Sequence, residues 1–389
     1  MSVLIAGYAR TPFSKFNGRF ASVPATKLGA HAISAALSRA GVAATDVQYV
    51  FAGQVLQGGA GQNPARQSAV GAGIPLSAPA ITLNAVCLSG MEAVVAAARM
   101  ISSGVADVAV AVGQESMSLA PHVFNARAGS KYGAIQALDT LEYDGLTDAF
   151  EQRSMGLSTE EGNGEYALDR QSQDKWAAAS HARAEASAAA LAEEIEPYKL
   201  VTRKGPMLVA DDDGVRPGTT EESLAPLRPA FGDGGTITAG NSSQITDGAA
   251  ALVLVSASAA KRLNLKPLAA IESHAFVAGP DVRLHEQPAN AITAAMARIN
   301  ADFRELSAVE INEAFAAVAV RSVQKLGISS EIVNTRGGAV ALGHPIGASG
   351  ARIVGSLARQ LAELGPGHLG AAGICGGGGQ GSAVVLRAV

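Results

Sequence analysis

Cys87 lies in ITLNAVCLSGMEAVVAAARMI, where a strand-like run gives way to a helical pattern. A thiol at such a junction lies near the first-turn amides of the helix, and the helix dipole favours its thiolate. We therefore expect a nucleophilic cysteine whose pKa is below about 8.5, the value of a free thiol. The alternative is a small apolar core residue, since Ala, Val and Leu surround it.

His344 lies between Gly343 and Pro345 in GGAVALGHPIGASGAR, a glycine-rich turn before a helical pattern that begins near Gly350. A rigid turn before a helix can hold an imidazole at a fixed point of a cleft, where it can act as a base. The glycines could instead cradle a phosphate, but the acidic residue and the spacing of a dinucleotide motif are missing. A hydrogen-bonded structural histidine is the other alternative.

Cys375 is followed directly by four glycines in AAGICGGGGQGSAVVLR. Because glycine runs are costly in backbone entropy, bare amides beside a thiol favour an oxyanion pocket over a flexible surface hairpin. Asn312 and Glu313 occur in VEINEAFAAVAV, at a strand-to-helix junction. Asn312 is either a site residue or a helix N-cap, and Glu313 is either a solvated or a structural carboxylate.

Other catalytic classes find no support in the sequence. The seven histidines are scattered, without an HExxH motif or paired cysteines, so we expect no metal site and no metal cofactor. A Ser-His-Asp hydrolase is also disfavoured, because no GxSxG motif is present.

Composition points to a compact globular chain of two to three domains, since it has 389 residues, 48% of them hydrophobic and 16% charged. The net charge is −4 and no segment concentrates basic residues, so we expect no nucleic-acid partner. The two cysteines form no CxxC pair, which favours a reducing compartment. The longest apolar run, about residues 249–255, is too short to span a membrane, and we expect a cytosolic protein.

The elements that must position these residues alternate between strand and helix patterns, which predicts an α/β fold. The first set is expected at 3–6, 25–41, 49–52, 81–84, 89–103 and 108–112, and the second at 289–300, 308–311, 312–326, 350–364 and 382–386. The sets are related, because AISAALSR from Ala32 matches AITAAMAR from Ala291, and the same offset carries Val50 onto Val309. We infer an internal duplication that places Cys87 and the His344 turn at equivalent points of two halves.

The segment between the halves is richer in charge and carries the only tryptophan, Trp176. We interpret it as an inserted loop domain for substrate recognition, since ligand sites favour domain junctions. The expected division is an N-terminal half over 1–115, completed by a strand at about 241–265, a loop domain over 116–240, and a C-terminal half over 266–389.

Four motifs together resemble the thiolase family: NAVCLSG, NEAFA from Asn312, GGAVALGHPIGASGAR and CGGGGQG. Their order and spacing match over nearly the whole chain, and the closest similarity is to the bacterial acetyl-CoA acetyltransferases of that family. The resemblance implies a duplicated fold in αβαβα layers with an inserted loop domain. It also implies a reversible Claisen condensation of two acetyl-CoA to acetoacetyl-CoA and CoA, and a place in fatty acid metabolism.

The resemblance implies a role for each catalytic residue. Cys87 would carry the acetyl group, His344 would be its base, and Cys375 would be the general acid and base for the α-proton. Asn312 would position a water that forms one oxyanion hole with His344, while the amides of Cys87 and Gly377 would form the second.

The resemblance also assigns residues to the bound CoA thioester. It implies that Ser243 contacts the pantetheine arm and Arg216 the adenine nucleotide, that Met155, Leu284, Ala314 and Phe315 line the acyl pocket, and that no cofactor is needed beyond the CoA substrates. Two positions depart from the family pattern, since Ser154 stands where relatives carry His, and Leu284 where they often carry Met. A homotetramer is implied by the resemblance alone.

Three alternatives stay open at this point. A thiolase of β-oxidation that accepts a broader range of 3-ketoacyl-CoA would carry the same catalytic residues. A condensing enzyme that uses an acyl carrier protein would typically pair its cysteine with two histidines, or with His and Asn, whereas Cys375 holds the third place here. A catalytically silent carrier of the same fold would not need all four catalytic residues.

Overall fold

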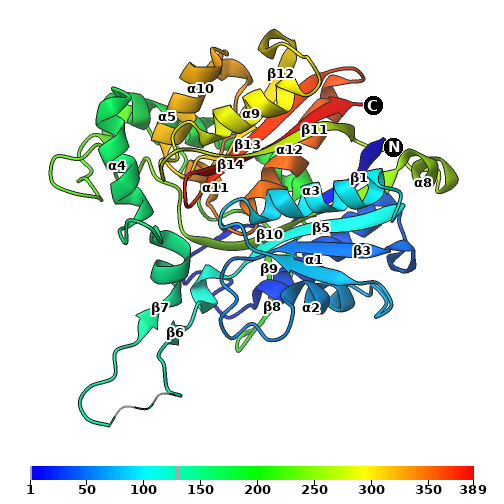
Figure 1. Ribbon diagram of the computed structural model, residues 1–389, viewed down its shortest axis with the longest axis horizontal. Coiled ribbons are helices and arrows are strands. Elements are labelled where there is room, and N and C mark those ends of the chain that lie inside the picture. The colour runs from blue at the N-terminus through cyan, green and yellow to red at the C-terminus, as the bar shows by residue number, and fades with distance from the viewer. Residues whose placement is uncertain (1, 128, 130) are drawn as a thin grey trace.

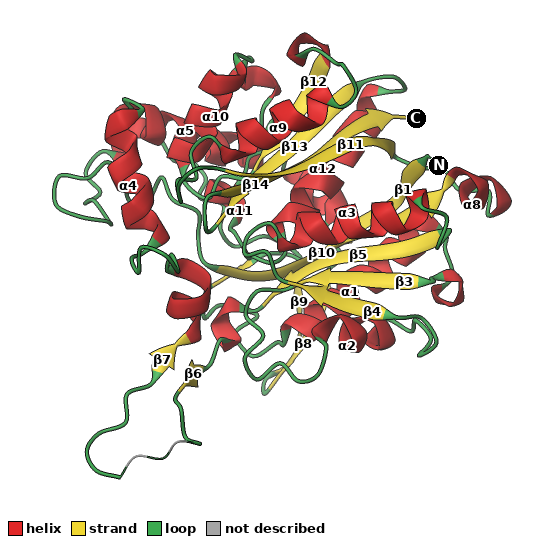
Figure 2. Cartoon of the chain, viewed as in Figure 1, coloured by secondary structure: helices red, strands yellow, loops and turns green. Residues whose placement is uncertain are grey.

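The computed structural model describes residues 2–127, 129 and 131–389. Its described residues contain a mixed sheet of ten strands (Figure 2). These are β1 (Val3–Arg10), β2 (Ser14–Lys15), β3 (Tyr49–Gly53), β4 (Ala80–Leu83), β5 (Val108–Glu115), β10 (Thr246–Ser256), β11 (Ala269–Ala278), β12 (Leu306–Ile311), β13 (Leu369–Gly376) and β14 (Gln380–Ala388).

The strand order shows the predicted duplication. It runs β12-β13-β14-β11-β1-β10-β5-β3-β4, so the series β1-β10-β5-β3 is matched on the other side of the sheet by β11-β14-β13-β12. In both series the outer pair is parallel and the inner pairs are antiparallel. The halves meet where Val3–Ile5 pair with Ala269–Ile271.

Helices cover the sheet in layers (Figure 1). The outer helices are α1 (Ala25–Ala40) and α2 (Pro64–Gly71) on the first half, and α9 (Gln287–Ala297) and α10 (Ala316–Leu326) on the second. The central helices are α3 (Ser89–Ser102) and α12 (Ser349–Leu364), which pack on each other and contact strands of both halves. Their buried apolar faces, including Met91 and Ile353, share one core with Phe51 and Ile374. This is the αβαβα layering that the family resemblance implies.

The segment between β5 and β10 forms its own elements beside the layers. They are β6 (His122–Val123), β7 (Leu138–Asp139), α4 (Met155–Glu165), α5 (Arg170–Ala186), α6 (Ala188–Glu194), β8 (Tyr198–Thr202), β9 (Gly205–Val209) and α7 (Glu221–Leu224). Two further short α-helices lie outside this segment: α8 (Ala257–Arg262) and α11 (Ala339–Leu342). The domain boundaries given above remain our interpretation. In the part of the chain described here, no helix is long and apolar enough to cross a membrane.

One predicted helix begins later than expected. The pattern over 312–326 predicted a helix from Asn312, whereas α10 begins at Ala316 and Phe315 occupies its N-cap position with extended backbone. Asn312 to Phe315 instead form a buried connection, in which the amide of Asn312 donates to the carbonyl of Gly373 at 3.0 Å. Asn312 is therefore not a helix cap.

The contact between α3 and α12 depends on glycine. A Cβ on Gly90 would lie 2.7 Å from the carbonyl oxygen of Gly347 and 2.9 Å from the amide nitrogen of Ala351, and backbone atoms cannot move away cheaply. We predict that Gly90→Ala lowers the free energy of unfolding by about 1–3 kcal/mol, the usual cost of overpacking.

The matched control is Gly164→Ala near the end of α4. A Cβ there meets no atom within 4 Å, and alanine is favoured over glycine in a helix by about 0.5–1 kcal/mol. Chemical unfolding of both variants measures the difference. Equal stability of Gly90→Ala and the parent chain would contradict the close approach of these two helices.

Candidate active site

A strained turn between β4 and α3 presents Cys87. The amide of Val86 donates to Asn84 Oδ1 at 3.0 Å, and Ser89 Oγ accepts from the amide of Ala85 at 2.9 Å while donating to the carbonyl of Val86 at 2.6 Å. Val86 has a φ of 51°, which a β-branched residue adopts only when its surroundings enforce it. The hydrogen bonds on both sides of Cys87 supply that constraint.

Contacts within its own turn favour one tautomer of His344. Its Nδ1 lies 2.6 Å from Ser349 Oγ, and that hydroxyl donates to the carbonyl of Pro345 at 3.1 Å. This pairing favours a ring proton on Nδ1, donated to Ser349, which leaves Nε2 as a bare acceptor. Nε2 is buried and has no hydrogen-bond partner in the described chain, so its lone pair is free to take up a proton.

Cys375 lies at the buried end of β13, so the surface-hairpin alternative for this cysteine is wrong. Gly376 ends β13, and the three glycines from Gly377 to Gly379 form the turn into β14. The amides of Cys87 and Gly377 lie close enough to the Cys87 sulfur to favour its thiolate and oppose the rise in its pKa. These two amides can therefore stabilise negative charge that develops at an atom bonded to Cys87.

These residues surround a cavity of about 350 Å³. Nine of the residues predicted from the sequence line it: Cys87, Met155, Ser243, Leu284, Ala314, Phe315, His344, Cys375 and Gly377. Asn312 lies behind the wall, with its Nδ2 3.5 Å from His344 Nδ1. Arg216 does not line the cavity; its side chain is exposed, and its amide donates to His181 Nδ1 at 3.1 Å.

Burial sets the charge state of the cavity. It raises the pKa of Cys87 to about 12, against the opposing effect of the two amides. It also raises the pKa of Cys375, and it lowers the pKa of His344 to about 3 with help from the Arg352 charge. The expectation that the helix dipole lowers the Cys87 pKa is therefore wrong, because desolvation of the thiolate outweighs the favourable amides. Thiol and imidazole are both neutral at rest.

Two buried carboxylates hold the turn that carries His344, and the sequence patterns did not single out the first of them. Glu115 accepts from the amides of Val55, Leu56 and Gly347 at 3.0, 3.2 and 2.9 Å, which ties the His344 turn to the first half. A buried carboxylate at the end of a core strand was the available signal, since such a group needs several donors. Burial raises its pKa to about 7.

Glu313 is the second of these carboxylates, and it is structural rather than solvated. Its oxygens accept from Trp176 Nε1 at 2.9 Å, Ser180 Oγ at 2.8 Å, Asn334 Nδ2 at 2.7 Å and the amide of Val340 at 3.0 Å. It therefore ties α5 of the inserted segment to the backbone that leads into the His344 turn.

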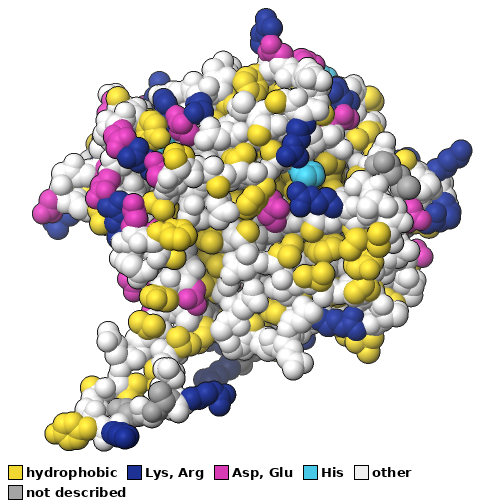
Figure 3. All heavy atoms as spheres, viewed as in Figure 1, with side chains coloured by type: hydrophobic (Ala, Val, Ile, Leu, Met, Phe, Trp, Pro, Cys, Tyr) yellow, Lys and Arg dark blue, Asp and Glu magenta, His cyan; other side chains and the backbone are white. Residues whose placement is uncertain are grey.

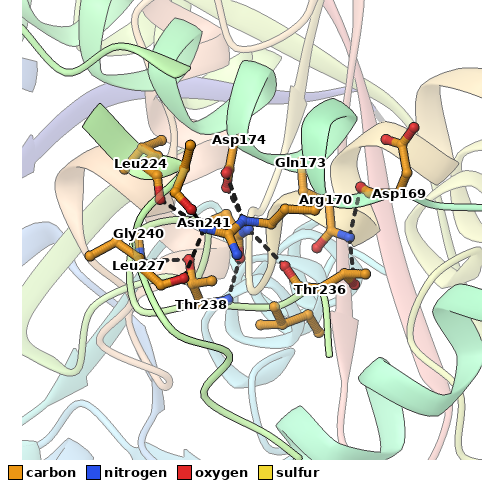
Figure 4. A network of polar contacts seen from close by, with 12 residues as sticks. Asp169, Arg170, Gln173, Asp174, Leu224, Leu227, Thr236, Thr238, Gly240 and Asn241 are labelled. Atoms are coloured by element: carbon orange, nitrogen blue, oxygen red, sulfur yellow. Dashed lines mark hydrogen bonds and ion pairs between the residues drawn. The ribbon is translucent and has the colours of Figure 1, made fainter. Parts of the chain in front are cut away.

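A polar network holds the segment that carries Ser243 (Figure 4). Arg170 Nε donates to Asp174 Oδ2 at 2.6 Å, and Asn241 Nδ2 donates to Asp174 Oδ1 at 2.8 Å. The carbonyl of Asn241 then accepts from the amide of Ala316 at 2.9 Å, so α5 and α10 together fix this wall of the cavity. Sequence reasoning did not find this network, because Asn241 lies 67 residues from its partner Asp174 in the chain.

The described residues contain no group of three or more His, Cys, Asp or Glu side chains placed to hold a metal ion. The chemistry offered by the cavity is that of two thiols, a neutral imidazole and backbone amides. Such a set can transfer an acyl group and move a proton from carbon.

Two models of known protein families match this chain. A family model described as "Thiolase, N-terminal domain" matches residues 3–258, and one described as "Thiolase, C-terminal domain" matches residues 265–388. The chain belongs to the thiolase family.

Relatives of this thiolase match over full length. A "Probable acetyl-CoA acetyltransferase" of Mycobacterium leprae is 50% identical over 392 residues, covering 100% of this chain and 99% of the relative. The protein of the same description from Mycobacterium tuberculosis is 50% identical over 391 residues, with the same coverage. An "Acetyl-CoA acetyltransferase" of Cupriavidus necator is 45% identical over 390 residues, covering 99% of each chain.

The neutral resting state of the thiolase predicts how Cys87 is alkylated. Because its pKa is about 12, the thiolate fraction is small at neutral pH and rises with pH. We predict that iodoacetamide labels Cys87 about tenfold faster per pH unit between about pH 7 and about pH 10. No inflection is expected near pH 6.5, because His344 with a pKa of about 3 does not titrate there.

Mass spectrometry of the labelled peptide gives the rate, and Cys87→Ala is the control that must lose the label. A rate that reaches its plateau by about pH 8 would show a thiolate stabilised as the helix dipole alone would predict.

Proposed function

We propose that this thiolase is an acetyl-CoA C-acetyltransferase that condenses two acetyl-CoA into acetoacetyl-CoA and CoA, and that it runs the reverse thiolysis with the same residues. The observation that carries the proposal is the presence of Cys87, Cys375 and the bare His344 Nε2 around one cavity. The full-length similarity to proteins named acetyl-CoA acetyltransferase supports the choice of substrate.

In the first half-reaction, Cys87 sulfur attacks the thioester carbon of acetyl-CoA while its proton passes to His344 Nε2. The developing oxyanion lies against the amides of Cys87 and Gly377, which already favour negative charge at the sulfur. The carbon–sulfur bond to CoA then breaks, and Cys375 protonates the departing thiolate. The products are acetyl-Cys87, free CoA, an imidazolium at His344 and a thiolate at Cys375.

In the second half-reaction, the Cys375 thiolate removes the α-proton of a second acetyl-CoA. The imidazolium N–H of His344 and a water held by Asn312 stabilise the enolate oxygen, since both side chains have a buried polar atom without a partner in the described chain. The carbanion attacks acetyl-Cys87 and forms acetoacetyl-CoA. Cys87 leaves as a thiolate and recovers its proton from His344, so the enzyme returns to its neutral state.

The CoA thioester is held by residues that line the same cavity as the reacting groups. We propose that Ser243 contacts the pantetheine arm, since its amide is fixed by the carbonyl of Ala314 at 3.1 Å and it lines the cavity. Met155, Leu284 and Phe315 form the apolar wall against the acyl group. Arg216 lies outside the cavity lining and is exposed to solvent, as a contact to the adenine nucleotide would require.

A homotetramer is also part of this proposal. Exposed apolar side chains cluster on the projecting β6–β7 hairpin, which Figure 3 shows at the lower left with yellow side chains. They include Phe124, 53% exposed, Tyr132, 100% exposed, and Ile135, 60% exposed. Apolar groups gathered on one projection favour a protein contact. Light scattering that gives the 39.2 kDa monomer at micromolar concentration would exclude any oligomer.

The cytosolic location, the role in fatty acid metabolism and the need for no cofactor beyond CoA substrates stay predictions.

Substitution of each of the two cysteines should impair a different half-reaction. We predict that acetyl-CoA leaves an acetyl adduct on the parent chain and none on Cys87→Ala, as measured by intact mass. Cys375→Ser should keep the adduct while condensation falls by about 10²- to 10⁴-fold, because a hydroxyl is a poor acid and base at that place. An adduct on Cys87→Ala, or full condensation by Cys375→Ser, would overturn these roles.

The length of the acyl chain tests which substrate this thiolase prefers. We expect kcat/KM for thiolysis of acetoacetyl-CoA to exceed that for 3-ketooctanoyl-CoA. Burial of each added methylene is worth only about 0.8 kcal/mol, which does not offset the displacement of Met155 and of water from the polar side chains beyond it. Equal or greater activity on the longer substrate would identify a thiolase of β-oxidation with a broader range.

A further inference from the structure

A second cavity adjoins the catalytic one. Its volume is about 550 Å³, and it is lined by residues that do not include Cys375 or His344. The two cavities have four lining residues in common: Val86, Gly145, Met155 and Gly377. The second cavity therefore begins at the wall of the first.

The wall between them is thin. Two of the four shared residues, Gly145 and Gly377, have no side chain, and a third, Met155, is an unbranched side chain that changes rotamer readily. Val86 precedes Cys87, and Gly377 lines the catalytic cavity together with Cys87. An acyl group on Cys87 would therefore lie against this wall, and a chain that extends past Met155 would enter the second cavity.

The second cavity differs in chemistry from the first. Hydrogen-bonding side chains line it, among them Gln57, Thr147 and Gln380, whereas the acyl wall of the first is mostly apolar. Two carboxylates, Asp144 and Asp148, also belong to its lining. None of the described residues that line it is Lys, Arg or His, so no cation there would balance a negative ligand.

We propose that this cavity is a second acyl subsite, which receives the tail of 3-ketoacyl-CoA substrates that end in a neutral hydrogen-bonding group such as a hydroxyl. The proposal rests on the proposed thiolase function and adds a substrate class to it. A plain alkyl tail gains nothing there, because it would displace water from polar side chains. A tail that ends in a carboxylate is repelled by Asp144 and Asp148.

The test compares thiolysis of four substrates by the purified full-length protein: acetoacetyl-CoA, 3-ketohexanoyl-CoA, 6-hydroxy-3-ketohexanoyl-CoA and 3-ketoadipyl-CoA. We expect kcat/KM for the hydroxylated six-carbon substrate to exceed that for the plain one by about threefold to tenfold, the effect of one hydrogen bond. The carboxylated substrate should be the poorest of the four.

Two variants link the preference to the cavity. Ala149→Trp places a large side chain in the second cavity and should remove the preference for the hydroxylated tail, while acetoacetyl-CoA thiolysis stays unchanged. Asp144→Asn removes one negative charge from an exposed side chain for which no hydrogen bond is found among the described residues, and should raise activity on 3-ketoadipyl-CoA relative to the hydroxylated substrate. Neither position touches the catalytic cavity.

The outcomes are distinguishable. No cleavage of acetoacetyl-CoA would overturn the proposed function itself. Cleavage of acetoacetyl-CoA with equal kcat/KM for the plain and hydroxylated six-carbon substrates would overturn only the second subsite. A hydroxyl preference that survives Ala149→Trp would also overturn it, because the preference would then arise elsewhere.

Discussion

Burial of the reacting groups is the constraint on which the rest of this site depends. Desolvation keeps Cys87 and Cys375 as thiols and His344 as a neutral imidazole, so no ion pair stands ready before substrate arrives. Charge must then appear only during the reaction, and it must be met by groups already in place. The two backbone amides at the Cys87 sulfur and the Ser349 hydroxyl at His344 meet that need without charges of their own.

The duplicated fold is what brings these groups together. Cys87 precedes α3 in the first half and His344 precedes α12 in the second, and the two helices pack side by side because Gly90 and Gly350 let their backbones approach closely. Glu115 and Glu313 then fix the His344 turn and the backbone that leads into it by accepting several donors each. Neither carboxylate lines the cavity.

Much of this arrangement was predictable from sequence, since the strand and helix patterns, the repeat and the four motifs are local signals. Nine of the named residues do line one cavity, and the duplication placed Cys87 near the His344 turn. The Cys87 pKa was predicted with the wrong sign, because helix position is readable in sequence whereas burial depends on the whole fold. The prediction that a helix begins at Asn312 was wrong for a related reason, since a connection between β12 and α10 takes the place of the expected first turn. The network of Asp174 and Asn241 has no local signature at all.

We propose that His344 rests as a neutral base with its ring proton on Nδ1. The most direct measurement is the ¹⁵N NMR titration of the ring nitrogens in the unliganded protein, with His344→Gln to assign the signals. We predict a protonated Nδ1 and a bare Nε2 that do not change between about pH 5 and about pH 9, because burial lowers the pKa of His344 to about 3. An imidazolium within that range, or a proton on Nε2, would contradict it.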